Sequence, residues 1–188
     1  MMKEEKVSVS SKFWLCSADC LCGTLSGLIT GGGMTYFYTK YLGLDEGLAS
    51  IVWMIFAVWN ALNDPLFGYI SDRTKSKLGR RIPYIRYGAL LYGVIFILSW
   101  FLWPLGGSQT ALFVQMLVSL FFFDTFYTAI ATSLYVLPYT MAESNQARSG
   151  IFVWKIFFTL LSLAAPLVLF PLVRPDVGES ASRFQTIM

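Results

Sequence analysis

The chain alternates between long apolar runs and short polar breaks. Five apolar runs emerge, and they cover residues 13–39, 48–70, 83–103, 111–139 and 151–173. Each run reaches the roughly 20 residues that a helix needs to cross the hydrocarbon core of a bilayer. None of them shows the strict alternation of a membrane β-strand, so the pattern predicts helices rather than a closed barrel. We therefore expect an all-α integral membrane protein with five spans.

Both ends of the chain are more polar than the runs between them. Residues 1–12 lack the basic start, the short apolar core and the small-residue cleavage site of a signal peptide. Residues 174–188 are typical of an external loop followed by the first turn of a sixth span. The expected organisation is an N-terminal tail at 1–12, a five-span bundle at 13–173, and a loop with the start of a sixth span at 174–188.

Positive charge is concentrated in the breaks after the second and fourth runs. The loop after the fourth run holds Arg148, and the loop after the second run holds Arg73, Lys75, Lys77, Arg80 and Arg81. The loop after the first run holds Lys40 beside two acids, and the loop after the third run holds no charge. Short cytoplasmic loops carry the excess of Lys and Arg. We therefore expect a multi-pass protein of the cell membrane with its N-terminus in the cytoplasm.

Composition mainly excludes other classes of protein. The chain is 56% hydrophobic and 13% charged, whereas a soluble domain carries about 25% charged residues. The net charge of +3 is small and gives no indication of nucleic-acid binding. Histidine, the commonest general base and metal ligand, is absent, and no nucleophile–base pair is evident. The sequence therefore does not indicate an enzyme.

Three cysteines, Cys16, Cys20 and Cys22, lie close together in the first run. Cys16 and Cys20 are one helical turn apart, so a metal site is conceivable. Free cysteine more often serves as a small, polarisable residue at a helix interface. We expect that structural role here, with no metal and no disulfide.

Polar side chains within the runs are candidates for function because burying them in lipid is costly. The second run places Asn60 and Asp64 one turn apart on one face, with Asn63 adjacent. Oxygen ligands of this kind suit a monovalent cation or a carried proton. The alternative is a hydrogen-bonded patch that only positions neighbouring helices.

The fourth and fifth runs carry further polar positions. The fourth run has a stripe whose spacing favours one helix face: Asp124, Thr128, Thr132 and Tyr135. Such a stripe normally faces a bundle interior or an aqueous cavity. Lys155 in the fifth run either extends to the membrane interface or neutralises an acid across a cavity. Asp19 in the first run is either an interfacial residue or part of the interior polar set.

The second run and its following loop resemble one family specifically. Residues 59–74 read WNALNDPLFGYISDRT, and residues 79–84 read GRRIPY. Residues 36–39, YFYT, look like the end of the same family's first span. This pattern resembles the glycoside–pentoside–hexuronide cation symporters, the melibiose-permease-like branch of the major facilitator superfamily.

The resemblance implies the N-terminal half of a twelve-helix fold, in which two six-helix halves rock around a solute and a cation. It implies a secondary active transporter that couples a proton or sodium ion to symport of a sugar or similar polar solute. No other cofactor is implied. The partners would be the solute, the coupling cation, the lipid bilayer and, for a fragment, the C-terminal half of the transporter.

The family binds its cation with two acids one turn apart on the second span, a nearby Asn and a fourth-span Thr. The matching positions are Asn60, Asp64, Asn63 and Thr128. The first acid is an amide here, which removes one negative charge. The resemblance therefore favours a proton over sodium, with Asp64 as the only carboxylate of the second-span set.

The family's two sugar-binding acids fall at Thr24 and Ala131, so its galactoside site is not carried over. Its fifth-span Arg position falls at Lys155, and a fourth-span aromatic falls at Tyr135. Two nearby acids could replace the missing ones. The expected solute-binding residues are Thr24, Asp19, Asp124, Tyr135 and Lys155.

Asp72 stands at the expected cytoplasmic mouth of the second span. Its carboxylate can pair there with Arg80, Arg81 or neighbouring helix ends. In the superfamily this loop motif latches the inner side, so these three residues are expected to gate rather than to bind solute.

Two other functions remain open. A transporter of the same fold for an amphiphile or drug-like solute is favoured by the loss of the sugar-binding acids, because a fold does not fix a substrate. A truncated membrane protein that does not transport is favoured by the five spans and the stop within a sixth.

Overall fold

The computed structural model describes residues 7–101, 107–173 and 186. Within these residues all regular structure is helical, and five helices are long and apolar enough to cross a membrane. They are Val9–Tyr41, Glu46–Arg73, Ile82–Phe101, Gln109–Met141 and Asn145–Leu169. The expected five-span all-α architecture is confirmed. The expected start of a sixth span lies almost wholly outside the described residues.

The first span begins earlier than expected and is broken in the middle. It starts at Val9 rather than at residue 13, because Ser8 caps it by accepting a hydrogen bond from the Ser11 amide at 3.1 Å. The span consists of α1 (Val9–Leu28), a π-helical segment (Ile29–Gly33), α2 (Met34–Tyr36) and a second π-helical segment (Phe37–Tyr41). Gly32 has φ of 102°, a conformation open to glycine, and it kinks the span.

Short polar side chains fix the starts of the later helices. Asp45 caps α3 (Glu46–Arg73) by accepting hydrogen bonds from Gly47 N at 2.8 Å and Leu48 N at 3.1 Å. Ser108 caps α5 (Gln109–Met141) through Ala111 N at 3.2 Å. The remaining helices are α4 (Ile82–Phe101) and α6 (Asn145–Val173). These caps satisfy amides that have no partner within the helix.

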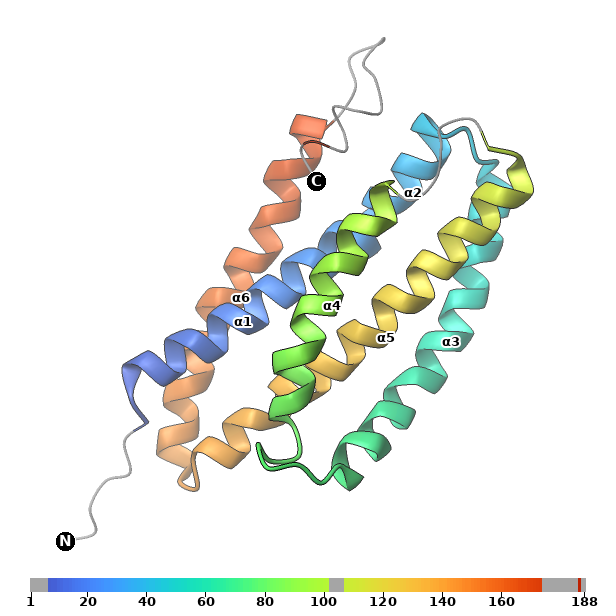
Figure 1. The fold of residues 1–188 in the computed structure, drawn as a ribbon. Helices are drawn as coiled ribbons and strands as arrows, with labels where there is room; N and C mark the ends of the chain where they lie inside the picture. The colour runs from blue at the N-terminus through green and yellow to red at the C-terminus, as the bar shows by residue number, and fades with distance from the viewer. Residues whose placement is uncertain (1–6, 102–106, 174–185, 187–188) are drawn as a thin grey trace, which may run out of the picture.

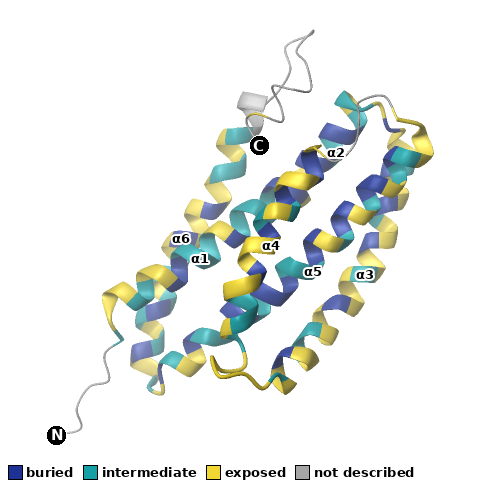
Figure 2. Cartoon of the chain, viewed as in Figure 1, coloured by how far each residue is buried: buried dark blue, intermediate teal, exposed yellow. Residues whose placement is uncertain are grey.

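Helix α5 is the centre of the bundle. Helices α3 and α4 both pack along it, whereas α6 packs mainly on α1 (Figure 1). Half of the most apolar window of α5 is buried within the described chain, a larger share than in any other span. Figure 2 shows many exposed positions along α3, α4 and α6. The buried polar side chains of α5, among them Asp124 and Thr128, therefore lie inside the bundle.

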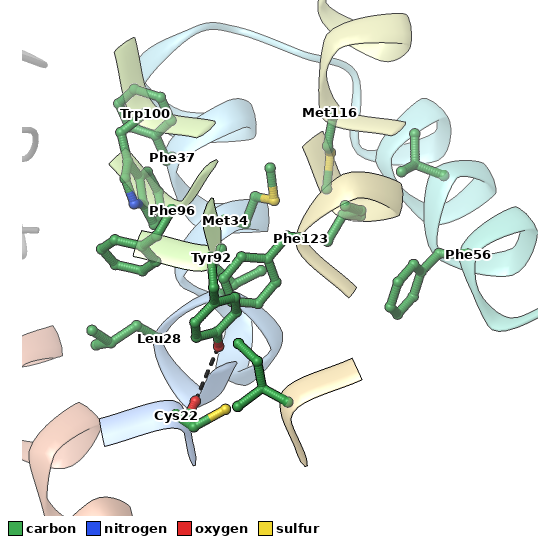
Figure 3. Packing of buried hydrophobic residues seen from close by; sticks show 14 of the residues in the cluster. Cys22, Leu28, Met34, Phe37, Phe56, Tyr92, Phe96, Trp100, Met116 and Phe123 are labelled. Carbon is green, nitrogen blue, oxygen red and sulfur yellow. Dashed lines mark hydrogen bonds between the residues drawn. The ribbon is translucent and has the colours of Figure 1, made fainter. Parts of the chain in front are cut away.

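An aromatic cluster joins the first span to α4 and α5 (Figure 3). The Phe37 and Trp100 rings meet edge to face with centroids 5.4 Å apart, and the Tyr92 and Phe123 rings have centroids 4.7 Å apart. The Tyr92 hydroxyl donates to the Cys22 carbonyl at 3.0 Å, so its polar end is satisfied inside the bundle.

Small residues bring α1 and α6 close together. A Cβ atom added at Gly23 would lie 3.0 Å from Ser162 Oγ, and one added at Gly27 would lie 3.3 Å from Pro166 Cγ. Glycines four residues apart allow this approach of two helices in lipid.

The positively charged loops lie at one end of the bundle. The start of α1, the end of α3 and the turn between α5 and α6 are found together there (Figure 1). The opposite end carries Lys40, Asp45 and Glu46, where Lys40 pairs with Glu46 at 2.9 Å. By the positive-inside rule, the prediction remains that this basic end faces the cytoplasm.

We expect Ser76→Cys to react with a membrane-impermeant thiol reagent only when the cytoplasmic side is accessible, because Ser76 is exposed within the basic loop. The measurement is labelling of intact and opened cells in a background whose three native cysteines are replaced. Glu46→Cys at the opposite end is the matched control and should label in intact cells. Labelling of Ser76→Cys in intact cells would show that the basic loop lies outside and that the predicted topology is wrong.

Candidate functional site

Four side chains form a polar group between α3 and α5, called here the α3–α5 polar group: Asp64, Asn63, Thr128 and Asp124. The Asn63 amide nitrogen Nδ2 donates to Asp124 Oδ2 at 2.8 Å and to Thr128 Oγ1 at 3.1 Å. Thr128 Oγ1 in turn donates to Asp64 Oδ1 at 3.1 Å. A continuous chain of hydrogen bonds therefore links two carboxylates on different helices.

The helical repeat explains how the α3–α5 polar group is assembled. Asp124 and Thr128 are four residues apart and share the face of α5 that meets α3. Asn63 and Asp64 are adjacent on α3 and point about 100° apart. Asn63 is consequently buried against α5, whereas Asp64 lies on an exposed face.

The structure adds an acid of α5 to the second-span residues. Asp124, expected among the solute-binding residues, accepts from the Asn63 amide, and its role in solute binding stays a prediction. Asp64 is the only carboxylate that α3 contributes to the group, and Asp124 is the one that α5 contributes. Asn60 is exposed one turn before Asp64, and among the described residues it makes no hydrogen bond to the group.

A second polar region lies between α1, α5 and α6. Lys155 Nζ lies 3.4 Å from Asp19 Oδ2, with the two side chains 16% and 27% exposed. The Lys155 ammonium also lies 5.7 Å from the centroid of the Tyr135 ring. Lys155 thus pairs with an acid across the helices rather than extending alone to the membrane interface.

A small cavity of about 140 Å³ borders this ion pair and is called here the α1–α6 cavity. Thr24 lies beside it and donates to Ser162 Oγ at 3.3 Å. The cavity walls combine carboxylate, hydroxyl and small apolar groups: Asp19, Cys20, Cys22, Gly23, Tyr127, Ala131, Thr159 and Ser162. Of the expected solute-binding residues, Asp19 lines this cavity, Thr24 contacts it through Ser162, and Lys155 contacts it through Asp19.

The third region is the expected gate at the end of α3. Arg81 Nη2 pairs with Asp72 Oδ1 at 2.6 Å, and Arg81 Nη1 donates to the Thr132 carbonyl of α5 at 3.4 Å. A cavity of about 650 Å³ lies beside this pair and is lined by Asp72, Arg81 and the exposed Arg80. Of the two candidate arginines, Arg81 is therefore the partner of Asp72, and it ties the basic loop to α5.

Cys20 and Cys22 both line the α1–α6 cavity, whereas Cys16 does not. Cys16 and Cys22 are buried, Cys20 is half-buried, and all three are free thiols. Cys16 Sγ faces the Ile151 carbonyl of α6 at 4.0 Å. In the part of the chain that the structure describes, no three His, Cys, Asp or Glu side chains are placed to hold a metal ion.

A family model described as MFS/sugar transport protein matches residues 23–188. The chain belongs to this family. The match covers most of the chain, including the α3–α5 polar group and the Asp72–Arg81 pair. Together with relatives named as symporters, this match confirms the resemblance to the symporter branch of the major facilitator superfamily. The chain corresponds to the N-terminal part of such a protein.

Similar proteins are named as symporters. The inner membrane symporter YicJ of Escherichia coli K12 is 24% identical over 95% of this chain and 38% of its own length. The putative glycoside/cation symporter YagG of the same strain is 26% identical over 74% of the chain and 30% of its own length. The mouse sodium-dependent lysophosphatidylcholine symporter 1 is 28% identical over 85% of the chain and 30% of its own length. The chain thus spans about a third of the length of the curated relatives it matches.

We expect Lys155→Met to lower the melting temperature of the protein, because it leaves the Asp19 carboxylate without its partner in a largely buried setting. Asp19→Asn combined with Lys155→Met should recover part of the loss, since neither charge is then unpaired. Thermal unfolding of the detergent-purified protein measures this cycle. Additive effects of the two substitutions would show that the pair is not energetically coupled.

Proposed function

We propose that this protein is the N-terminal part of a secondary active transporter that couples a cation to symport of a sugar or similar polar solute. The observation that carries the proposal is the α3–α5 polar group. It places two carboxylates, an amide and a hydroxyl between helices of a membrane protein. Such groups are costly in a membrane and therefore normally mark a functional site. The cell membrane, with the N-terminus in the cytoplasm, is the corresponding location.

The coupling cation binds at Asp64, whose carboxylate is held by the Thr128 hydroxyl, and Asn63 in turn donates to that hydroxyl. Asp64 lies on the exposed face of α3, where an ion can reach it, whereas its partners are buried. Asn63 Nδ2 presents hydrogen-bond donors at the centre of the group. Donors at that point favour a proton, which needs a single carboxylate oxygen, over a metal ion, which needs several oxygen ligands.

The solute binds beside the α1–α6 cavity. The Asp19–Lys155 pair and the Thr24 and Ser162 hydroxyls can exchange hydrogen bonds with the hydroxyl groups of a sugar. Tyr135, close to the Lys155 ammonium, offers a ring face for stacking. The name of the glycoside/cation symporter relative from Escherichia coli supports this class of solute.

An amphiphilic solute is the second candidate. It is favoured by the threonine and alanine at the two sugar-acid positions, Thr24 and Ala131, and by the similarity to the mouse lysophosphatidylcholine symporter. Competition by monosaccharides and glycosides against radiolabelled solute uptake, compared with competition by a lysophospholipid, distinguishes the two classes.

We expect Asp64→Asn to abolish cation-driven accumulation while leaving solute exchange in part. The substitution keeps the size of the side chain and removes the charge that the cation requires. The measurement is uptake and counterflow by the complete transporter in proteoliposomes. Accumulation that persists in this variant would refute a coupling role for Asp64.

The same proteoliposomes identify the ion. An imposed proton gradient should drive accumulation at constant sodium. Uptake that follows a sodium gradient at constant pH, and ignores the proton gradient, would show that sodium is the coupling ion.

We expect Asp72→Asn to change the transport rate with little effect on solute affinity, because Asp72 holds Arg81 at the end of α3, away from the α1–α6 cavity. Comparing the maximal uptake rate with the equilibrium binding constant measures this. Glu143→Gln, an acid in the turn after α5, serves as a charge-matched control. A selective loss of binding in Asp72→Asn would contradict a gating role.

A further inference from the structure

Asp124 is a carboxylate in the membrane interior that the family's acid positions do not account for. It lies on α5 and is 7% exposed, and its carboxylate accepts from the Asn63 amide at 2.8 Å. The family's two cation-binding acids both lie on the second span, where this chain has Asn60 and Asp64. One acid is therefore missing from α3, and one appears across the interface on α5.

No cation of the described chain neutralises the α3–α5 polar group. The ion pairs of the described residues involve other acids: Glu46 with Lys40, Asp72 with Arg81, and Asp19 with Lys155. Within the described residues, the Asp124 and Asp64 carboxylates hydrogen-bond only to the neutral side chains of Asn63 and Thr128. Two carboxylates in this setting strongly favour the uptake of a positive ion.

The Asn63 side chain gives a separate indication of a missing ligand. Asn63 is fully buried, and its carbonyl oxygen Oδ1 has no hydrogen-bond partner in the described structure. A buried acceptor without a donor is costly, and such groups normally bond to protein, water or an ion. This carbonyl belongs to the same amide whose nitrogen contacts both Asp124 and Thr128.

We infer that Asp124 supplies, from α5, the second negative charge of the coupling site, in place of the acid that α3 lacks at Asn60. The two negative charges of the site then lie on opposite sides of the α3–α5 interface rather than both on α3. Movement of α3 against α5 during transport would change the separation of the two charges and so the affinity for the cation. This inference rests on the proposed cation-coupled symport.

The test is to move the charge back to α3. Asp124→Asn should lower cation-driven accumulation about tenfold or more, because one buried charge of the site is removed. Asn60→Asp combined with Asp124→Asn should restore a substantial part of it, since the acid again lies one turn from Asp64. Uptake and counterflow are measured in proteoliposomes for the complete transporter, together with the number of cations moved per solute.

Ser133→Ala is the matched control, because Ser133 is a fully buried hydroxyl of α5 whose recorded bond goes only to the Ala129 carbonyl of its own helix. It should leave coupling unchanged. If Asp124→Asn does not fold, the double variant decides: coupled uptake by the double variant supports the inference, and its failure to fold or to couple overturns it.

The outcomes also separate this inference from the proposed function. A wild-type protein without cation-driven uptake would refute the proposed function itself. A wild type that couples, with Asp64→Asn uncoupled and Asp124→Asn fully coupled, would overturn only the role of Asp124.

Discussion

The cost of placing polar groups in hydrocarbon is the constraint on which the rest of this structure depends. Lipid offers no hydrogen bonds, so each polar side chain within a span needs a partner on its own helix or on another one. Helix α5 meets this need because it lies between α3, α4 and the α1–α6 pair. Two residues of its polar stripe, Asp124 and Thr128, are bonded across the interface with α3, and these contacts bring candidate functional groups together.

The two polar regions solve the charge problem differently. In the α1–α6 cavity an ammonium offsets a carboxylate, so the pair Lys155–Asp19 is locally neutral. In the α3–α5 polar group two carboxylates are linked only through an amide and a hydroxyl. Neutral surroundings suit a polar solute that carries no charge, whereas a negative group suits a cation. This division of charge fits the uncharged solute and the cation of the proposed symporter.

Helix starts and close helix contacts could be recognised from local sequence. Asp45 and Ser108 are short polar residues directly before apolar runs, and each caps a helix. Gly23 and Gly27, four residues apart, mark the close contact with α6. The break at Gly32 could not be predicted in the same way, because three consecutive glycines permit a kink without requiring one. The part of the first span that follows the kink contacts α3, where the Trp53 indole donates to the Thr35 hydroxyl at 2.7 Å.

The sequence by itself determined the five spans, the basic end of the bundle, the family, and the presence of Asn63, Asp64 and Thr128 as candidates. These features depend on hydropathy, charge and a local motif, all of which are properties of contiguous residues. Only the tertiary structure decided which acid joins which group. Periodicity places Asp124 on one face of α5, but the rotation and axial register of α5 against α3 depend on packing along both helices. That register sets Asp124 beside Asn63, leaves Asn60 exposed, and selects Arg81 as the partner of Asp72.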